Sequence, residues 1–270
     1  MSAVICSPAN KLIKEVASLK QKKYRDELGL FIAEGVRIVE ECAASAWPVH
    51  ICIYTETAAA RERTRRVLDR LAAARCRLVA VPEAIYNKLS DTEQPQGIMA
   101  VLKKRQATLA QMLAPAGQVP LIVVLDGIQD PGNAGAIIRT ADAAGCTGVI
   151  VVKGAADIYA GKTVRATMGS LFHLPVWEGV APGELITALT AANVSILATS
   201  LQNADIYYHA DLKRPVAVVL GNEGQGVGRE LLDKADGCLT IPLVGDAESL
   251  NVAVAAGVIL YEAVRQRATL

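Results

Sequence analysis

The 270-residue chain contains few aromatic residues, which make up 4% of it, and only three histidines. No apolar run is long enough to span a bilayer, and residues 1–8 lack the pattern of a signal peptide. The three histidines (His50, His173 and His209) are isolated, so no metal site is expected. The six cysteines also lack paired spacing, which favours reduced thiols in a cytoplasmic protein; they are Cys6, Cys42, Cys52, Cys76, Cys146 and Cys238.

Two common nucleotide-binding patterns are absent as well. The dinucleotide fingerprint Gly-x-Gly-x-x-Gly fails in the frames that begin at Gly224 and Gly226, because Arg229 and Leu231 occupy its third glycine position. No Gly-x-x-x-x-Gly-Lys-Ser/Thr loop for phosphate binding occurs either. A nucleotide- or NAD-dependent enzyme on an ordinary open sheet is therefore disfavoured, although it stays an alternative at this point.

The chain is rich in hydrophobic residues (52%), which suits an α/β protein with ample core. Its formal net charge of +1 is the sum of a basic first part and an acidic second part. Residues 1–105 hold 18 lysine and arginine against 12 acidic residues, and residues 106–270 hold 10 against 15. The basic part suggests contact with a polyanion. The alternative is that arginines only solvate one helix face; these are Arg61, Arg63, Arg65, Arg66 and Arg70.

Composition changes near residues 104–119, where a short helical pattern is followed by a break that contains proline and glycine. This change predicts a first domain at 1–104, a linker at 105–119 and a second domain at 120–270. The first domain is predicted to be a small α/β sandwich with parallel pairing. Its first helix is expected to begin with Ser7 as the N-cap and Pro8, and to end near Lys23. Further strands are expected at 30–33, 49–55, 78–81 and 97–102, and helices at 34–44, 58–74 and 83–89.

The second domain alternates more clearly between short apolar runs and helical patterns. The runs are continuously apolar and rich in β-branched residues, which is typical of parallel strands buried on both faces. Strands are predicted at 121–126, 149–152, 195–199, 216–220 and 238–241. Helices are predicted at 133–144, 161–168, 183–192, 229–234 and 250–267. The last helix is amphipathic, and its apolar face would pack on the core or on a partner subunit.

Three segments rich in glycine and asparagine lie in order in this domain, at residues 130–139, 220–228 and 241–251. Each follows an apolar run and opens or leads into a helix. Such turns bring backbone N–H groups to one edge of a parallel sheet, where α/β proteins bind ligands. A purely structural role as turn glycines remains open for those of the second segment, which are Gly221, Gly224, Gly226 and Gly228.

Polar residues in the same segments predict a site for a polar substrate. Asn133, Asn222 and Asn251 each stand next to a glycine or a helix start, where any single asparagine could serve only as a cap. Three of them in one domain favour a convergent site. A cation among apolar neighbours on a predicted helix would suit a phosphate group. The accompanying residues are Glu223, Ser249 and Arg139.

The amino-acid sequences of the three segments, and their order in the chain, resemble those of the SpoU-type RNA ribose 2′-O-methyltransferases of the SPOUT superfamily. The matching motifs are Pro-Gly-Asn-x-Gly-Ala-Ile-Ile-Arg-Thr-Ala, Gly-Asn-Glu-Gly-x-Gly and Ile-Pro-(x)5-Glu-Ser-Leu-Asn-Val-(x)2-Ala. The first domain resembles that family's ribosomal-protein-like substrate-binding module, through residues 29–37 and 96–101. That second match is weaker than the first.

This resemblance implies an α/β methyltransferase domain with a deep trefoil knot, preceded by a smaller RNA-binding domain. Residues 220–226 and 241–251 would form knot loops that hold S-adenosylmethionine. Such proteins are typically homodimers, with the site completed across the interface, and the 250–267 helix is a plausible interface element. The cofactor-binding residues implied by the match are Thr199, Leu220, Gly221, Asn222, Gly224, Ile241, Leu243, Leu250 and Asn251.

The reaction implied is attack of a ribose 2′-hydroxyl on the sulfonium methyl group, without a metal. Arg139 matches the arginine implicated in the family's catalysis. Because a guanidinium is always protonated, we expect it to anchor a phosphate rather than to act as a base. Asn251 would also cap the final helix. The residues expected to orient the ribose and the loop are Asn133, Glu223, Ser249 and Asn251.

Large-subunit ribosomal RNA is the expected substrate, because of the accessory first domain. Two alternatives remain open: a methyltransferase directed at transfer RNA, and a non-catalytic RNA-binding protein that keeps the fold. Within the family, an enzyme that confers antibiotic resistance through ribosomal RNA is a further possibility.

Overall fold

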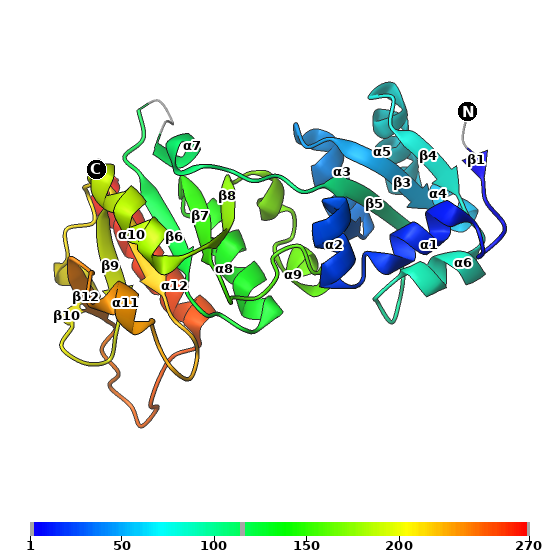
Figure 1. The fold of residues 1–270 in the computed structure, drawn as a ribbon. Helices are drawn as coiled ribbons and strands as arrows, with labels where there is room; N and C mark the ends of the chain where they lie inside the picture. Colours follow the sequence, from blue (N-terminus) through cyan, green and yellow to red (C-terminus); the bar gives the residue numbers. More distant parts are fainter. Residues whose placement is uncertain (1–2, 114–116, 269–270) are drawn as a thin grey trace. The chain divides into compact units, whose positions relative to one another are not determined.

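The structure is a computed structural model that describes residues 3–113 and 117–268 (Figure 1). It divides into two compact units. Unit 1 comprises Met1–Lys104 and Asp157–Phe172, and unit 2 comprises Arg105–Ala156 and His173–Leu270. This division differs from the one expected from the sequence, because a segment of the predicted second domain packs within unit 1.

Unit 1 contains a five-stranded sheet in the order β1-β4-β3-β5-β2. Neighbouring strands β1, β4 and β3 are parallel, but β5 is antiparallel to both β3 and β2. The prediction of parallel pairing is therefore wrong for β5. After β4, the chain does not return to the end of the sheet where β3 and β4 begin. Instead, β5 begins beside Tyr54, the last residue of β3, and runs in the opposite direction. The strands are β1 (Ala3–Val4), β2 (Leu30–Glu34), β3 (Val49–Tyr54), β4 (Arg77–Ala80) and β5 (Ile98–Lys103).

The first predicted helix is wrong in both its start and its length. Asn10, not Ser7, is the N-cap, and its side chain accepts a hydrogen bond from the N–H of Leu12. The predicted single helix at 58–74 is also two helices, because Arg61 adopts an extended conformation between them. The helices of residues 11–89 are α1 (Lys11–Ser18), α2 (Lys22–Leu28), α3 (Val36–Ala44), α4 (Glu56–Ala59), α5 (Glu62–Ala73) and α6 (Glu83–Leu89).

The segment Asp157–Phe172 contributes α9 (Gly161–Ala166) and a 3-10 turn, η1 (Ser170–Phe172), to unit 1. Tyr159, 1% exposed, lies with its ring centroid 4.7 Å from that of Phe31 in β2. The ring of Phe172 lies edge-on to Trp47 at 5.4 Å. These aromatic side chains belong to the core of unit 1, which explains why the segment groups with it.

Unit 2 is built on a seven-stranded sheet, entirely parallel, in the order β10-β12-β9-β11-β6-β7-β8. The five strands predicted here are confirmed to within one residue at each end; they are β6 (Leu121–Leu125), β7 (Gly148–Val152), β9 (Ser195–Thr199), β11 (Val216–Leu220) and β12 (Gly237–Thr240). The sequence did not predict the two outer strands, β8 (Val176–Val180) and β10 (Asp205–Ile206). In β8 a glycine with positive φ, Gly179, interrupts the apolar pattern.

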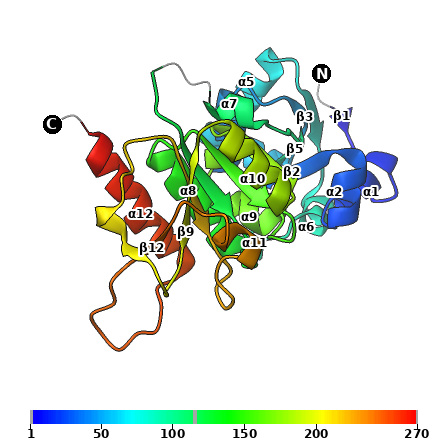
Figure 2. The same cartoon turned by 60° about the vertical axis from the view of Figure 1, so that its left-hand side comes forward.

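Helices cover both faces of this sheet (Figures 1 and 2). Buried side chains of α7 (Leu109–Leu113), α10 (Pro182–Ala191) and α11 (Arg229–Leu232) pack against one face. On the other, α8 (Pro131–Ala143) lies beside α12 (Val252–Arg267). The expected linker is thus partly structured, because Met112 of α7 is fully buried in this core. In the described ranges, no helix combines the length and the apolar character that crossing a membrane requires.

Candidate functional site

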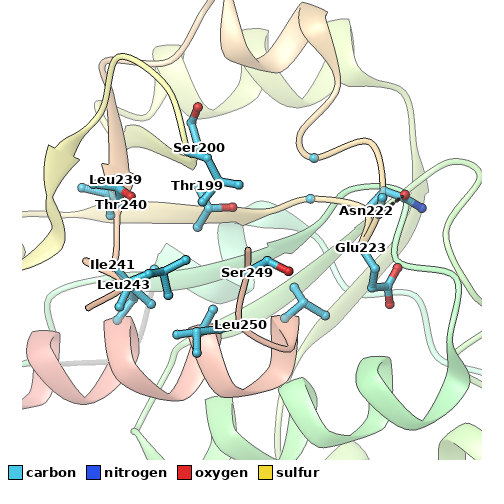
Figure 3. A pocket seen from close by; sticks show the side chains of 17 residues that line it. Thr199, Ser200, Asn222, Glu223, Leu239, Thr240, Ile241, Leu243, Ser249 and Leu250 are labelled. Carbon is cyan, nitrogen blue, oxygen red and sulfur yellow. Dashed lines mark hydrogen bonds between the residues drawn. The ribbon is translucent and has the colours of Figure 1, made fainter. Parts of the chain in front are cut away.

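A cavity of about 210 Å³ opens at the carboxyl ends of β9, β11 and β12, beside the first turns of α12 (Figure 3). Asn222 and Glu223 stand at one end of it, and Ile241 and Leu243 at the other. Seven of the nine residues expected to bind the cofactor line the cavity; they are Thr199, Gly221, Asn222, Gly224, Ile241, Leu243 and Leu250. The two others do not: Leu220 is fully buried within the sheet, and Asn251 is absent from the lining.

Further lining residues were not predicted, because they lie outside the glycine-rich segments or carry no polar signal. Ser200 and Leu201 follow β9, and Leu239 and Thr240 end β12. Their position at the carboxyl edge of a parallel sheet is the signal that could have identified them. The remaining unpredicted lining residues are Gly226, Val252, Ala255 and Ile259.

The loop after β11 folds back on itself so closely that Gly221 has no room for a side chain. A Cβ at this position would lie 2.2 Å from the backbone of Gly226 and Val227. The loop is closed by reciprocal backbone hydrogen bonds between Asn222 and Gly226, each 2.9 Å long. Gly221 is therefore required by the close approach of two backbone segments, and it also lines the cavity.

Asn222 organises the same loop through its side chain. Its Oδ1 accepts hydrogen bonds from the N–H groups of Gly224 (2.9 Å) and Gln225 (3.0 Å). Its Nδ2 donates to the carbonyl oxygen of Gly127 (2.8 Å), in the turn after β6. Asp126 makes a second link, because its Oδ2 accepts a hydrogen bond from the N–H of Gly228 (2.6 Å). The second segment is thus tied at two points to the turn that leads into the first.

Three polar side chains join the three segments in one chain of hydrogen bonds. Asn133, in the first turn of α8, donates from Nδ2 to Oε1 of Glu223 (2.9 Å). Its Oδ1 accepts a hydrogen bond from Nδ2 of Asn251 (3.0 Å). Asn251 also caps α12, since its Oδ1 accepts from the N–H of Ala253 (2.9 Å). The structure thus confirms that Asn251 caps the final helix, and its expected role in orienting the ribose stays a prediction.

The carboxyl group of Glu223 has a pKa below its usual value. Partial burial opposes ionisation, but the hydrogen bond from Asn133 and backbone N–H groups outweigh that effect. One of these is the N–H of Gln129, at a long 3.5 Å from Oε2. Glu223 is thus held as a carboxylate that accepts hydrogen bonds at the edge of the cavity.

Ser249 lines the cavity, whereas Arg139 does not. Arg139 stands six residues after Asn133 on α8, so it points about 120° away from Asn133 around the helix axis. Its side chain is exposed and makes no hydrogen bond or ion pair within the described residues. The structure thus leaves this guanidinium available to an anion from outside the chain.

Models of known protein families match both parts of this chain. The model of the SpoU rRNA methylase family matches residues 120–261, more than half of the chain. The chain belongs to the SpoU rRNA methylase family. An MRM3-like substrate binding domain matches residues 10–100. Both matches agree with the resemblance found in the sequence.

Members of the SpoU family resemble this chain over nearly its whole length. A 23S rRNA (guanosine(2553)-2′-O)-methyltransferase of Bacillus subtilis is 38% identical over 255 residues, which cover 94% of this chain and 96% of the relative. A 23S rRNA (uridine(2479)-2′-O)-methyltransferase of Streptomyces viridochromogenes is 34% identical, covering 93% and 88%. The crystal structure of an AdoMet-bound rRNA methyltransferase from Sinorhizobium meliloti superposes with a TM-score of 0.88 at 33% identity, covering 99% of each chain.

Proposed function

We propose that this protein transfers a methyl group from S-adenosylmethionine to a ribose 2′-hydroxyl of large-subunit ribosomal RNA. The observation that carries the proposal is the cavity at the carboxyl edge of the parallel sheet, flanked by the Glu223–Asn133–Asn251 chain of hydrogen bonds. The relatives support the substrate class, because their names specify 23S rRNA and 2′-O-methylation.

The lining of the cavity fits this cofactor. Apolar side chains supply walls for an adenine ring, and the glycine loop exposes backbone groups that suit its polar edge. The Ser249 hydroxyl adds a donor for the ribose or the amino-acid part, whereas the Thr199 hydroxyl donates to the carbonyl oxygen of Val219 (3.0 Å) and can only accept a further hydrogen bond. When bound, S-adenosylmethionine supplies an electrophilic methyl carbon on a sulfonium sulfur. The apolar walls are Leu239, Ile241, Leu243, Leu250 and Ile259.

The protein's own contribution would be to position the ribose and to anchor its phosphate. Glu223, kept ionised by its hydrogen bonds, can accept a hydrogen bond from a ribose hydroxyl. Asn133 and Asn251 hold Glu223 in place against the cavity. Arg139 would bind a phosphate beside the target ribose, because it is exposed and has no partner within the described residues. Holding the reactants in line is the main source of rate acceleration here.

Two features implied by the family resemblance remain proposals. We propose a trefoil knot formed by residues 220–226 and 241–251; their position around the cavity supports it. We also propose a homodimer through α12, because its exposed face carries Val254 and Tyr261, which are 54% and 52% exposed. Exposed apolar side chains grouped on one helix are typical of a subunit interface.

Unit 1 would bind the RNA, since residues 1–104, which belong to it, hold 17 lysine and arginine against 12 acidic residues. Affinity of the intact chain for RNA should therefore fall steeply with salt concentration. The cytoplasmic location expected from the cysteines stays a prediction. Ribosomal rather than transfer RNA as the substrate is supported by the names of the relatives, which specify 23S rRNA.

Two measurements test the function. Calorimetric titration should show binding of S-adenosylhomocysteine and none of NAD. Mass-spectrometric mapping should reveal one ribose methylation in large-subunit RNA that disappears from cells without the protein. Cofactor binding without any methylation would favour the non-catalytic alternative, and methylation confined to transfer RNA would replace the proposed substrate. Absence of cofactor binding would overturn the proposal.

A further inference from the structure

Gln129 lies in the turn between β6 and α8, and its side chain joins two loops. Its Nε2 donates hydrogen bonds to the carbonyl oxygens of Gly127 (3.1 Å) and Gly154 (2.9 Å). Gly127 follows β6, and Gly154 follows the neighbouring strand β7. The Gln129 side chain therefore fastens the turn at residues 127–130 to the carboxyl end of the next strand.

The same turn touches the hydrogen-bonded chain of the site at several points. The carbonyl oxygen of Gly127 also accepts the hydrogen bond from Nδ2 of Asn222. The N–H of Gln129 points at Oε2 of Glu223. Asp130 caps α8, because its Oδ1 accepts from the N–H of Asn133 (2.8 Å). A shift of this turn would therefore displace Asn133 and Glu223 relative to one another.

A backbone contact holds the turn from the same side. The N–H of Ala156 donates to the carbonyl oxygen of Ile128 (2.7 Å), and Ile128 is fully buried. Gly154 and Ala156 are among the last residues of unit 2 before the chain enters unit 1 at Asp157. The turn is thus fastened to the stretch of chain that leads into the proposed RNA-binding unit.

We propose that Gln129 is a positioning residue for methyl transfer, acting through Asn133 and Glu223. The inference rests on the proposed function, which it deepens. Gln129 is exposed, and hydrogen bonds at such a position contribute little to stability. A displacement of about 1 Å in a catalytic group can nevertheless slow a reaction roughly 100-fold. Replacing Gln129 should therefore slow turnover and leave the stability of the fold nearly unchanged.

The test replaces Gln129 with methionine, which keeps the length of the side chain and removes its donor. Gln106→Met is the matched control, because Nε2 of Gln106 donates a hydrogen bond of 2.9 Å to the carbonyl of Glu178, also in unit 2. We expect Gln129→Met to lower kcat about 10-fold or more. The KM for S-adenosylmethionine and the melting temperature should change no more than in Gln106→Met. Equal kcat values for the two variants would overturn the proposal, as would a matching loss of cofactor affinity or stability.

A second measurement does not depend on activity. Side-chain amide protons of Asn133, followed by NMR in the intact protein, should exchange with solvent several-fold faster in Gln129→Met than in Gln106→Met. Unchanged exchange would contradict the inference even if the wild-type protein proved inactive. Conversely, inactive wild-type protein with faster Asn133 exchange in Gln129→Met would count against the proposed function and not against this positioning role.

Discussion

Asn133 and Glu223 lie 90 positions apart in the chain and share a hydrogen bond of 2.9 Å between Nδ2 and Oε1. Because the amide oxygen of Asn133 accepts a hydrogen bond from Asn251, this single side chain connects all three segments rich in glycine and asparagine. The amide donates at one end and accepts at the other, so its orientation is determined by its two partners.

Replacing Asn133 with aspartate should therefore be as harmful as replacing it with alanine. The isosteric carboxylate cannot donate to Glu223 and would repel it. We expect both variants to slow single-turnover methyl transfer by roughly 10- to 100-fold, the range for misplaced catalytic groups. Affinity for S-adenosylhomocysteine should change little, since Asn133 does not line the cavity. Near-normal rates in Asn133→Asp would show that the link to Glu223 has no part in turnover.

Arg139→Ala should abolish methyl transfer and leave S-adenosylhomocysteine affinity nearly intact, because Arg139 stands outside the cavity lining. Arg139→Lys should keep only part of the rate, since an ammonium group lacks the bidentate fork of a guanidinium. Arg229→Ala is the matched control, because Arg229 is exposed and pairs with Asp233, the C-cap of its own helix. Filter assays with labelled methyl donor measure the rates. A fully active Arg139→Ala protein would exclude this arginine from the reaction.

Arg25→Met should destabilise unit 1 strongly. Arg25 and Asp157 form an ion pair of 2.6 Å whose side chains are only 6% and 10% exposed. Removing the cation leaves a buried carboxylate unpaired, which typically costs about 3–5 kcal/mol. The control Arg63→Met breaks an exposed pair with Glu40 and should cost less than about 1 kcal/mol. Urea unfolding monitored by circular dichroism gives both values; equal losses would show that burial of the first pair is unimportant.

Stability should also depend on Glu262 at acidic pH. Hydrogen bonding to Arg265, against the opposing effect of burial and with help from Gln266, lowers the pKa of Glu262. A carboxyl with a lowered pKa in the folded state contributes its full stability above its unfolded pKa of about 4.3, and loses it as pH falls through the folded value.

Glu262→Gln should therefore cost roughly 1–3 kcal/mol at pH 7, as for other hydrogen bonds to charged groups. The difference from wild type should shrink between pH 5 and 3, whereas Glu230→Gln, at an exposed position, should show little difference at either pH. Urea titrations at several pH values provide the test. A difference that stays constant across this range would mean that Glu262 does not titrate in it.

Val254→Asp and Tyr261→Asp should dissociate the proposed dimer, because each places a charge on the exposed apolar face of α12. Light scattering should then report half the mass of the wild-type particle. Leu28→Asp, at an exposed apolar position of α2, is the control and should leave the mass unchanged. A wild-type protein that is already monomeric would refute this proposed assembly.

The sequence predicted the parallel sheet of unit 2 well because its strands are buried on both faces and read as unbroken apolar runs, as at 216–220. It missed β8, where Trp177, Glu178 and Gly179 obscure that pattern. Helix starts were harder, because a Ser-Pro pair resembles an N-cap although Asn10 makes the capping hydrogen bond.

Local sequence patterns could not show which distant segments of the chain pack against one another. The apolar residues of α9 are compatible with any core, so nothing in them shows that they pack in unit 1. The asparagines and glycines identified the segments of the site, but the pairing of Asn133 with Asn251 depends on the packing of α8 beside α12. Residues of one motif can also point in different directions. Arg139 and Asn133 belong to the same segment, yet they lie on different faces of α8.

The return of Asp157–Phe172 to unit 1 has a consequence for synthesis on the ribosome. Domains generally fold as soon as their residues have emerged, beginning with the amino-terminal one. Here Asp157, the ion-pair partner of Arg25, and Tyr159, which packs on Phe31, are translated only after β6 and β7. The amino-terminal unit must therefore wait, incomplete, until more than half of the polypeptide has been made, whereas unit 2 is complete only once α12 has been synthesised.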